Sequence, residues 1–208
     1  MTATNCLAHT PHLRSFLRGV AAMLMDNGVF VAEFPYVWRL IDGCLLDTVY
    51  HEHQSYLGLQ ALVSHLPELG LYAVDAEIVE VHGGSVRLWA WPRWRKRTAR
   101  LETLLVAERQ RYPTAPVSYV AFIEAAQRRR ASIRMRLMDL RPDVALIAGF
   151  GASAKATQIL NWCGLGPETV AFVTDSNPLK QGRAVPGVRI PIVPEAWLAE
   201  KRPDLVIN

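Results

Sequence analysis

The 208-residue sequence lacks any run of about 18 consecutive apolar residues, so no membrane span is expected. It has no basic N-terminal segment followed by an apolar stretch, which argues against a secretory signal peptide. Only three cysteines are present, Cys6, Cys44 and Cys163, and none forms a CxxC pair. The sequence therefore predicts neither a disulfide framework nor a cysteine zinc site, and indicates a protein of the reducing cytoplasm.

Charge is unevenly distributed, with 13 Lys or Arg but four Asp or Glu between Arg93 and Arg141. A basic segment of this kind occurs in nucleic-acid-binding proteins and also on the solvated faces of ordinary helices. Few aromatic residues are interleaved for base stacking, and no recognisable nucleic-acid module surrounds the segment. We therefore expect solvated helices, with nucleic-acid binding as the alternative. Nothing in the sequence indicates an oligomeric state.

Apolar periodicity predicts α/β structure in the first part of the chain. An amphipathic helix over 11–26, with no strand before it, should be followed by a buried strand over 29–34. A helix over 59–69 and two strands over 71–79 and 86–91, joined by a turn at 82–84, complete this part. Two further helices, over 98–111 and 117–140, are separated by the proline-rich stretch 113–116.

The last part of the sequence predicts a parallel α/β unit. Arg141-Pro142-Asp143 opens it, and the apolar run 144–148 is typical of a strand buried on both faces. A glycine-rich turn over 149–155, a helix through Trp162, a strand over 170–174 and a last strand over 205–207 follow. We expect three parts: residues 1–92, a helical connector over 93–141, and a second α/β domain over 142–208.

Tyr50-His51-Glu52-His53, placed on a loop, is the densest group of proton-handling side chains in the sequence. Histidine is the side chain best suited to general base catalysis near neutral pH, and tyrosine can donate to a developing oxyanion. Such a group is also typical of a polar surface loop. A metal site formed with His82 is a further alternative, although His-x-His is a weak signal.

Two glycine turns are candidate ligand sites. Gly83-Gly84, between His82 and Ser85, permits close approach of a ligand, so Ser85 and Arg87 are candidates to reach a phosphate or a sugar hydroxyl. The turn over 149–155 follows a strand and opens a helix, as a phosphate-binding turn does, but Ala154 replaces the third glycine of GxGxxG. Both turns are equally compatible with purely structural roles. The same holds for Asn5 and His9, which can simply cap the first helix.

Taken together, these segments resemble the S-adenosylmethionine-dependent sugar C-methyltransferases that act on dTDP-linked 4-keto-deoxysugars. The matching stretches span nearly the whole chain in the expected order. They are NCLAH (5–9), GVFVAEFPY (28–36), DTVYHEHQSY (47–56), HGGSVR (82–87), GFGASAKATQILN (149–161) and DSNPLKQGR (175–183). The family has a zinc-binding N-terminal domain, a Rossmann methyltransferase domain and a C-terminal α/β domain that helps to hold the nucleotide sugar. The resemblance implies that residues 1–92 are the C-terminal part of the methyltransferase domain and 142–208 the Rossmann-like nucleotide-sugar domain.

The resemblance also implies roles for the candidate residues. His53 would remove the proton beside the sugar ketone, with Tyr50 and His9 near the reacting atoms and Glu52 supporting the histidines. Asn5 would border the methyl-donor pocket. The remaining candidates would hold the substrate and its diphosphate: His82, Gly83, Gly84, Ser85, Arg87, Gly151, Ser153, Lys155, Lys180 and Arg183.

Neither the family's glycine loop for S-adenosylmethionine nor its zinc cysteines occur in the sequence, so we expect a truncated homologue that binds the methyl donor poorly alone and holds no metal. The alternative is a non-catalytic module that binds a nucleotide or a nucleotide sugar.

Overall fold

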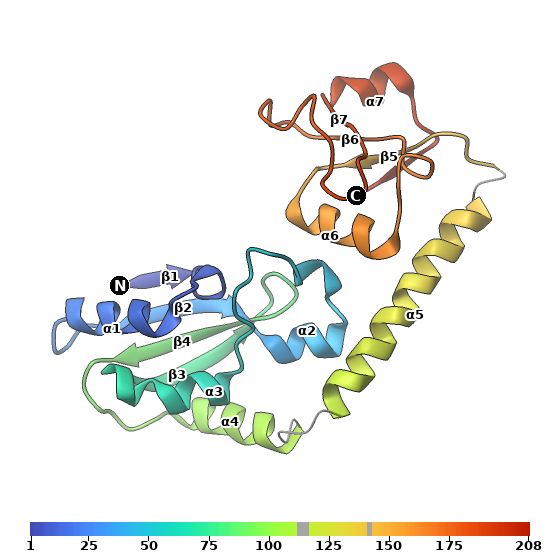
Figure 1. The fold of residues 1–208 in the computed structure, drawn as a ribbon. Coiled ribbons are helices and arrows are strands. Elements are labelled where there is room, and N and C mark those ends of the chain that lie inside the picture. Colours follow the sequence, from blue (N-terminus) through green and yellow to red (C-terminus); the bar gives the residue numbers. More distant parts are fainter. Residues whose placement is uncertain (112–116, 141–142) are drawn as a thin grey trace. The chain divides into compact units, whose positions relative to one another are not determined.

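The computed structural model describes residues 1–111, 117–140 and 143–208, which form two compact units (Figure 1). The first unit comprises residues 1–45 and 51–122, and the second comprises 46–50 and 123–208. Each unit contains helices and one four-stranded sheet, which confirms the predicted α/β class. The proline-rich stretch 113–116 and the residues Arg141-Pro142 lie outside the described residues.

The sheet of the first unit has the strand order β1-β2-β4-β3. β1 runs parallel to β2, and the other neighbours pair antiparallel. Along β4, Val86, Leu88 and Ala90 are buried while Arg87 and Trp89 on the other face are partly exposed, which is the period of two expected of a strand. The strands are β1 (Thr2–Thr4), β2 (Phe30–Pro35), β3 (Tyr72–Val79) and β4 (Ser85–Trp91).

Helices cover the apolar face of this sheet and supply half of its core. Leu17 and Val20 of the first helix recur at helical spacing and are buried against Phe30 and Phe34 of β2 in one apolar cluster. Leu59, Leu62 and Leu105 from later helices join the same cluster. The helices are η1 (Leu7–His9), α1 (Leu13–Met23), α2 (Val37–Gly43), α3 (Leu59–His65), η3 (Pro67–Leu69) and α4 (Ala99–Arg111).

Three expectations for the first unit need correction. The chain does have a strand before α1, because β1 is defined by its pairing with β2 and is too short to show a pattern of its own. The helix expected over 59–69 is divided, since α3 ends at His65 and Pro67, which cannot donate a backbone hydrogen bond, begins η3. The two-turn helix α2 was not expected, because its sequence VWRLIDG is too short to show a helical period.

The predicted hairpin between β3 and β4 is confirmed, and its glycines are required. Gly83 and Gly84 both have positive φ, 84° and 118°. A Cβ atom on Gly83 would lie 2.5 Å from Leu45 Cδ1, and one on Gly84 would lie 2.6 Å from Arg39 Cγ. The turn is therefore packed tightly against Arg39 of α2 and against Leu45, which follows that helix.

The second unit contains a parallel sheet with the order β7-β6-β5-β8. The long helix α5 (Val117–Leu140) begins in the first unit, and its residues from Ile123 belong to the second. Leu137 of α5, Leu160 of α6 and Ile190 share one apolar cluster with the sheet. The elements are η2 (Leu46–Thr48), β5 (Ile147–Phe150), α6 (Ala154–Cys163), β6 (Phe172–Thr174), β7 (Ile192–Val193), α7 (Ala196–Lys201) and β8 (Leu205–Ile207).

The first strand of this unit begins later than its apolar run predicts. The amides of Ala145 and Leu146 both donate to the Asp204 carboxylate, at 3.0 and 2.8 Å, so these residues are held by a side chain and β5 starts at Ile147. The short elements β7 and α7 were not expected. In the part of the chain that the structure describes, no helix is long and apolar enough to cross a membrane.

Candidate functional site

Two histidines from distant parts of the sequence meet in the first unit. His9 ends η1, and His53 lies on the loop that precedes α3. The carbonyl oxygen of Ala8 accepts hydrogen bonds from the amides of Gln54 and Ser55, at 2.7 and 3.1 Å, and this main-chain pairing places the loop beside η1. As a result, the imidazole rings of His9 and His53 meet edge to face with their centroids 4.8 Å apart.

Tyr56 completes an aromatic surround for His53 that sequence reasoning missed. Its ring lies edge to face with that of His53 at a centroid distance of 6.1 Å. His53 is partly buried, whereas His9 and Tyr56 are exposed. The three-residue spacing of His53 and Tyr56 was the available signal. An imidazole that contacts two neighbouring rings and is still partly open to solvent is suited to taking a proton from a bound molecule.

Asn5 stands at the carboxyl end of β1, directly before η1. Its φ of 53° is in the left-handed region, which asparagine tolerates better than most residues. Its amide N–H donates to the carbonyl of Glu33 in β2, at 2.8 Å. The side-chain oxygen Oδ1 is buried and has no hydrogen-bond partner among the described residues. A buried, unpaired acceptor costs free energy, so this atom is a candidate to bind a ligand donor.

His51 and Glu52 of the predicted tetrad occupy an exposed turn, and Tyr50 before it is partly buried. Glu52 Oε1 lies 4.0 Å from His51 Nε2, and both side chains are largely exposed. Gln54 Nε2 donates to the carbonyl of His51 at 2.8 Å, which stabilises the turn. Tyr50 is grouped with the second unit, whereas His51, Glu52 and His53 belong to the first.

Ser85, in the second predicted motif, is committed to protein contacts. Its hydroxyl is buried and donates to the carbonyl of Val81 at 3.0 Å, which closes the turn that also contains His82. His82 itself is exposed with a φ of 53°. The turn therefore presents His82 and Gly83 to solvent, while Ser85 stabilises it from inside.

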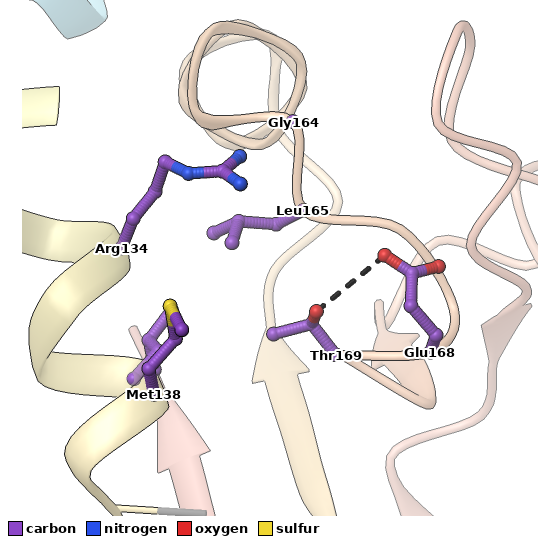
Figure 2. A pocket seen from close by; sticks show the side chains of 7 residues that line it. Arg134, Met138, Gly164, Leu165, Glu168 and Thr169 are labelled. Atoms are coloured by element: carbon purple, nitrogen blue, oxygen red, sulfur yellow. Dashed lines mark hydrogen bonds between the residues drawn. The ribbon is translucent and has the colours of Figure 1, made fainter. Parts of the chain in front are cut away.

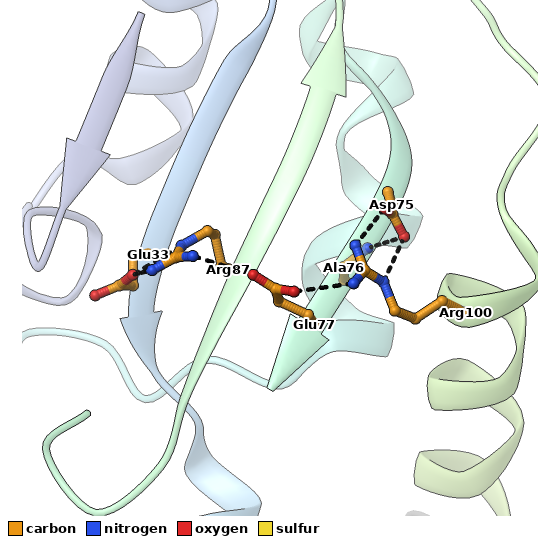
Figure 3. Close-up of polar contacts among 6 residues, drawn as sticks. All are labelled: Glu33, Asp75, Ala76, Glu77, Arg87 and Arg100. Atoms are coloured by element: carbon orange, nitrogen blue, oxygen red, sulfur yellow. Dashed lines mark hydrogen bonds and ion pairs between the residues drawn. The ribbon is translucent and has the colours of Figure 1, made fainter. Parts of the chain in front are cut away.

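Arg87 lies in a row of charges across the sheet (Figure 3). Its guanidinium donates to Glu33 at 2.8 Å and to Glu77 at 3.1 Å, and Arg100 of α4 continues the row to Glu77 and Asp75. Hydrogen bonding to Glu33 raises the pKa of Arg87, and hydrogen bonding to Arg100 lowers the pKa of Asp75. The row pairs residues directly opposite each other on β2, β4 and β3.

The glycine turn of the second unit borders a cavity of about 550 Å³. Apolar side chains from α5, α6 and the sheet form most of its wall, including Leu137, Ile159 and Val173. Gly151, Ser153 and Lys155 supply polar groups at its edge. A largely apolar cavity of this size with a few polar groups is typical of a small-molecule site.

The turn itself has features of an anion site. Gly151 has a φ of 86°, and a Cβ atom added there would meet nothing within 4 Å, so the glycine is needed for its conformation and the space beside it is open. Ser153 caps α6 by accepting the amide of Ala156 at 3.1 Å. The first amides of a helix lack intrahelical partners and carry the positive end of its dipole.

The three cations predicted to bind phosphate differ in their surroundings. Lys155 Nζ lies 2.8 Å from the carboxylate of Asp47 in η2, also part of the second unit. Lys180 Nζ donates to Asp175 Oδ2 at 2.9 Å and to the carbonyl of Ala152 at 3.0 Å. The side chain of Arg183 is exposed.

No role was assigned from the sequence to the two acids that bind these lysines, Asp47 and Asp175. Asp175 could have been found, because it directly follows β6 at the carboxyl edge of a parallel sheet. Asp47 carries no comparable signal, since only its contact with α6 distinguishes it from other surface carboxylates.

A second, smaller cavity of about 140 Å³ lies between α5 and the segment after α6 (Figure 2). Arg134 donates to the carbonyl of Cys163 at 2.5 Å, beside the left-handed Gly164 that ends the helix. A cation at a helix C-terminus is stabilising. This cavity is smaller than a typical small-molecule site, and Arg134 there joins α5 to α6.

Many cations of the basic segment contact other residues of the chain. Ion pairs with carboxylates are made by Arg93, Arg97, Arg100, Arg111 and Arg128. Arg95 lies over the ring of Trp91 and Arg130 over that of Trp162. These contacts favour solvated helices over a nucleic-acid-binding surface. Within the described residues, no group of three His, Cys, Asp or Glu is placed to hold a metal ion.

A protein-family model and a known protein both match most of the chain. A family model described as "C-methyltransferase C-terminal domain" matches residues 80–207. C-methyltransferase NovU of Streptomyces niveus is 36% identical over 201 residues, which are 96% of this chain and 48% of that protein. The chain thus spans about half the length of this relative.

Proposed function

The chain belongs to the C-methyltransferase family, and from this we propose that it acts in the transfer of a methyl group from S-adenosylmethionine to a carbon of a dTDP-linked keto-sugar. The single observation that carries the proposal is the contact between His53 and His9, two residues that lie far apart in the sequence. The chain spans about half the length of this relative, so the complete methyl-transfer reaction is proposed for this chain and not taken from the comparison.

We assign the first sheet to the C-terminal part of a Rossmann-like methyltransferase domain. The parallel pair β1 and β2, followed by an antiparallel hairpin, supports this assignment. The parallel sheet of the second unit would be a Rossmann-like nucleotide-sugar domain. Its glycine turn between β5 and α6, next to a cavity, supports that role.

In the proposed reaction His53 is the general base. A ketone acidifies the proton on the neighbouring carbon, and a neutral imidazole nitrogen of His53 takes it. His9 and Tyr56 both contact the ring edge to face, which would restrict its rotation when the proton arrives. Tyr50 would donate to the developing enolate oxygen, and Glu52 would support the histidines.

The methyl donor would supply an electrophilic methyl carbon: the enolate carbon would bond to it as the carbon–sulfur bond breaks, and S-adenosylhomocysteine would leave with the electron pair on sulfur. Asn5 fits a place at the border of the donor site, because its buried Oδ1 lacks a partner among the described residues and can accept a donor N–H or O–H. Its position at the carboxyl end of a parallel strand is where α/β sheets usually bind ligands.

The second unit would hold the nucleotide. The amides of Ser153 and Ala154, with Lys155, would bind the diphosphate, and the apolar cavity would take the rest of the nucleotide. Lys155 would exchange its contact with Asp47 for the phosphate. His82 and Gly83, on the exposed hairpin turn, remain candidates for the sugar, as does the partly exposed Arg87, while the buried Gly84 and Ser85 would support the turn from inside. The exposed Arg183 completes the proposed substrate set, to which the resemblance also assigns Lys180.

The proposal is tested by incubating the chain with a dTDP-4-keto-deoxysugar and with S-adenosylmethionine at a concentration high enough to offset the weak donor binding expected of this chain, and by measuring the mass of the sugar. We expect the sugar to gain one carbon-bound methyl group and His53→Ala to abolish the gain. The control is His12→Ala, because His12 is exposed and makes no side-chain cap on α1. Transfer that persists in His53→Ala near the unmodified rate would contradict the base assignment.

The second candidate function is a non-catalytic module that binds a nucleotide or a nucleotide sugar. The cavity of about 550 Å³ favours this function, because all residues that line it, including those of the turn over 149–155, belong to the second unit. Binding of dTDP without methyl transfer would support this function over the first. Calorimetry with dTDP that gives no heat would contradict it.

A further inference from the structure

Asp175 and Lys180 together hold the main chain of one residue of the glycine turn, Ala152, through its N–H and its carbonyl. The amide N–H of Ala152 donates to Asp175 Oδ2 at 3.0 Å, and the carbonyl of Ala152 accepts from Lys180 Nζ at 3.0 Å. The lysine and the aspartate close the ring with an ion pair of 2.9 Å. Both polar groups of Ala152 are thus bound by side chains that follow β6.

Both oxygens of the Asp175 carboxylate accept hydrogen bonds from protein donors. Its other oxygen, Oδ1, accepts the amide of Asn177 at 2.9 Å, and the residue is only 8% exposed. An acid at the end of the second strand of a dinucleotide-binding unit binds a ribose hydroxyl. Here the acid is turned toward the protein, so that ribose contact is not available from Asp175.

The next residues of the turn are left for a ligand. Gly151 donates its amide to the carbonyl of Thr174 at 2.8 Å, which fixes the other side of Ala152. The open space beside Gly151 and the first amides of α6 then lie along the edge of the cavity. A small rotation of the Ala152 peptide would turn these amides away.

We propose that Asp175 and Lys180 are positioning residues: they fix the main chain on both sides of Ala152 so that the turn presents its following amides to the diphosphate of a bound nucleotide, and neither contacts the ligand. This inference rests on the proposed nucleotide binding, and it revises the direct phosphate contact implied for Lys180. Lys155, whose partner is a surface carboxylate, is the cation that reaches the ligand.

The test combines two measurements on the full chain. Hydrogen exchange of the Ala152 amide reports on the turn without any ligand, and calorimetry with dTDP at low and high salt reports on binding. The variants are Asp175→Asn, Lys180→Met, their combination, and Lys180→Arg as a conservative rescue. Lys201→Met is the matched control, because it removes one exposed cation of the same unit.

We expect Asp175→Asn and Lys180→Met each to speed Ala152 exchange by about tenfold or more and to weaken dTDP binding about tenfold. The double variant should change Ala152 exchange and dTDP affinity no more than the more damaging of the two single variants, because each single substitution already breaks the same ring of contacts. Lys180→Met should leave the salt dependence of binding unchanged, since no phosphate contact is removed, and Lys180→Arg should restore both readouts.

Two results would overturn the inference. One is weaker and less salt-dependent dTDP binding in Lys180→Met with Ala152 exchange unchanged, which would make Lys180 a direct phosphate ligand. The other is unchanged exchange in both single variants. If the unmodified chain does not bind dTDP, nucleotide binding itself fails, and the exchange rates still decide whether the two residues hold the turn.

Discussion

The imidazole rings of His9 and His53 meet edge to face with centroids 4.8 Å apart, and the main chain places them there. Ala8, the neighbour of His9, accepts the amides of Gln54 and Ser55, the neighbours of His53. The contact therefore depends on backbone geometry at both residues and not on the side chains finding each other. A substitution of either ring should leave the loop in place, which makes the pair suitable for functional tests.

Glu108 should be among the most important single side chains for the stability of the first unit. It is 6% exposed and accepts the Tyr36 hydroxyl at 2.6 Å and the amides of Leu59 and Gln60 at 3.0 Å. We expect Glu108→Gln to lower the free energy of unfolding by about 2 kcal/mol, because the amide group cannot accept from all three donors. Urea unfolding measures this. Glu102→Gln on the same helix, where the carboxylate is exposed, should change it by less than about 0.5 kcal/mol.

The hairpin glycine should be far less tolerant than a helical one. Gly84→Ala would strain a φ of 118° and bring Cβ to 2.6 Å from Arg39, so we expect a loss of roughly 2 kcal/mol or more. Gly19 in α1 has nothing within 4 Å of an added Cβ, and Gly19→Ala should stabilise by about 0.5–1 kcal/mol. Thermal unfolding of both variants gives the comparison. Equal melting temperatures would contradict the packing described for the turn.

The sequence predicts much of this architecture, because its signals are local. The hairpin glycines, the glycine turn and the helices α4 and α5 all follow from nearby residues. The strand β1 and the pairing of Ala145 with Asp204 depend on contacts between distant residues, so no local pattern shows them.

In the candidate site, too, some features follow from local sequence and others depend on contacts between distant residues. The tetrad and Asn5 can be named from the sequence, but the contact of His53 with His9 and Tyr56 needs the fold. The same is true of Asp175, whose carboxylate the fold directs to Ala152.

Asp175 should contribute stability that depends on pH. Hydrogen bonding to Lys180 lowers the pKa of Asp175 below its ordinary value of 3.8. A carboxyl whose pKa is lower in the folded state stabilises the fold above its ordinary pKa and loses that effect as the pH falls through the folded value. The destabilisation caused by Asp175→Asn should therefore be complete at pH 7 and shrink below about pH 4. Unfolding at a series of pH values measures it, with exposed Asp139→Asn as the control. A destabilisation that stays constant to pH 2 would contradict the ion pair.

The three cysteines should differ sharply in reactivity. Cys6 is exposed, while Cys44 and Cys163 are buried, and burial raises the pKa of the Cys163 thiol. Because the thiolate is the reactive form, Cys163 should resist labelling for two reasons: the reagent cannot reach it, and its raised pKa leaves little thiolate. We expect a thiol reagent to label Cys6 alone in the folded protein and all three cysteines in denaturant. Mass mapping of the labelled peptides checks this, and rapid labelling of Cys163 in the folded chain would contradict its place in the core.

The assignment of His53 as the base is tested most directly by a step that needs no methyl donor. In deuterated water the base should exchange the proton beside the ketone of a dTDP-4-keto-deoxysugar, and NMR follows the deuterium that appears at that carbon. We predict catalysed exchange by the unmodified chain, a fall of about 100-fold or more in His53→Ala, and an unchanged rate in His12→Ala. Exchange in His53→Ala at the unmodified rate, or none above the rate in buffer with the unmodified chain, would contradict this account.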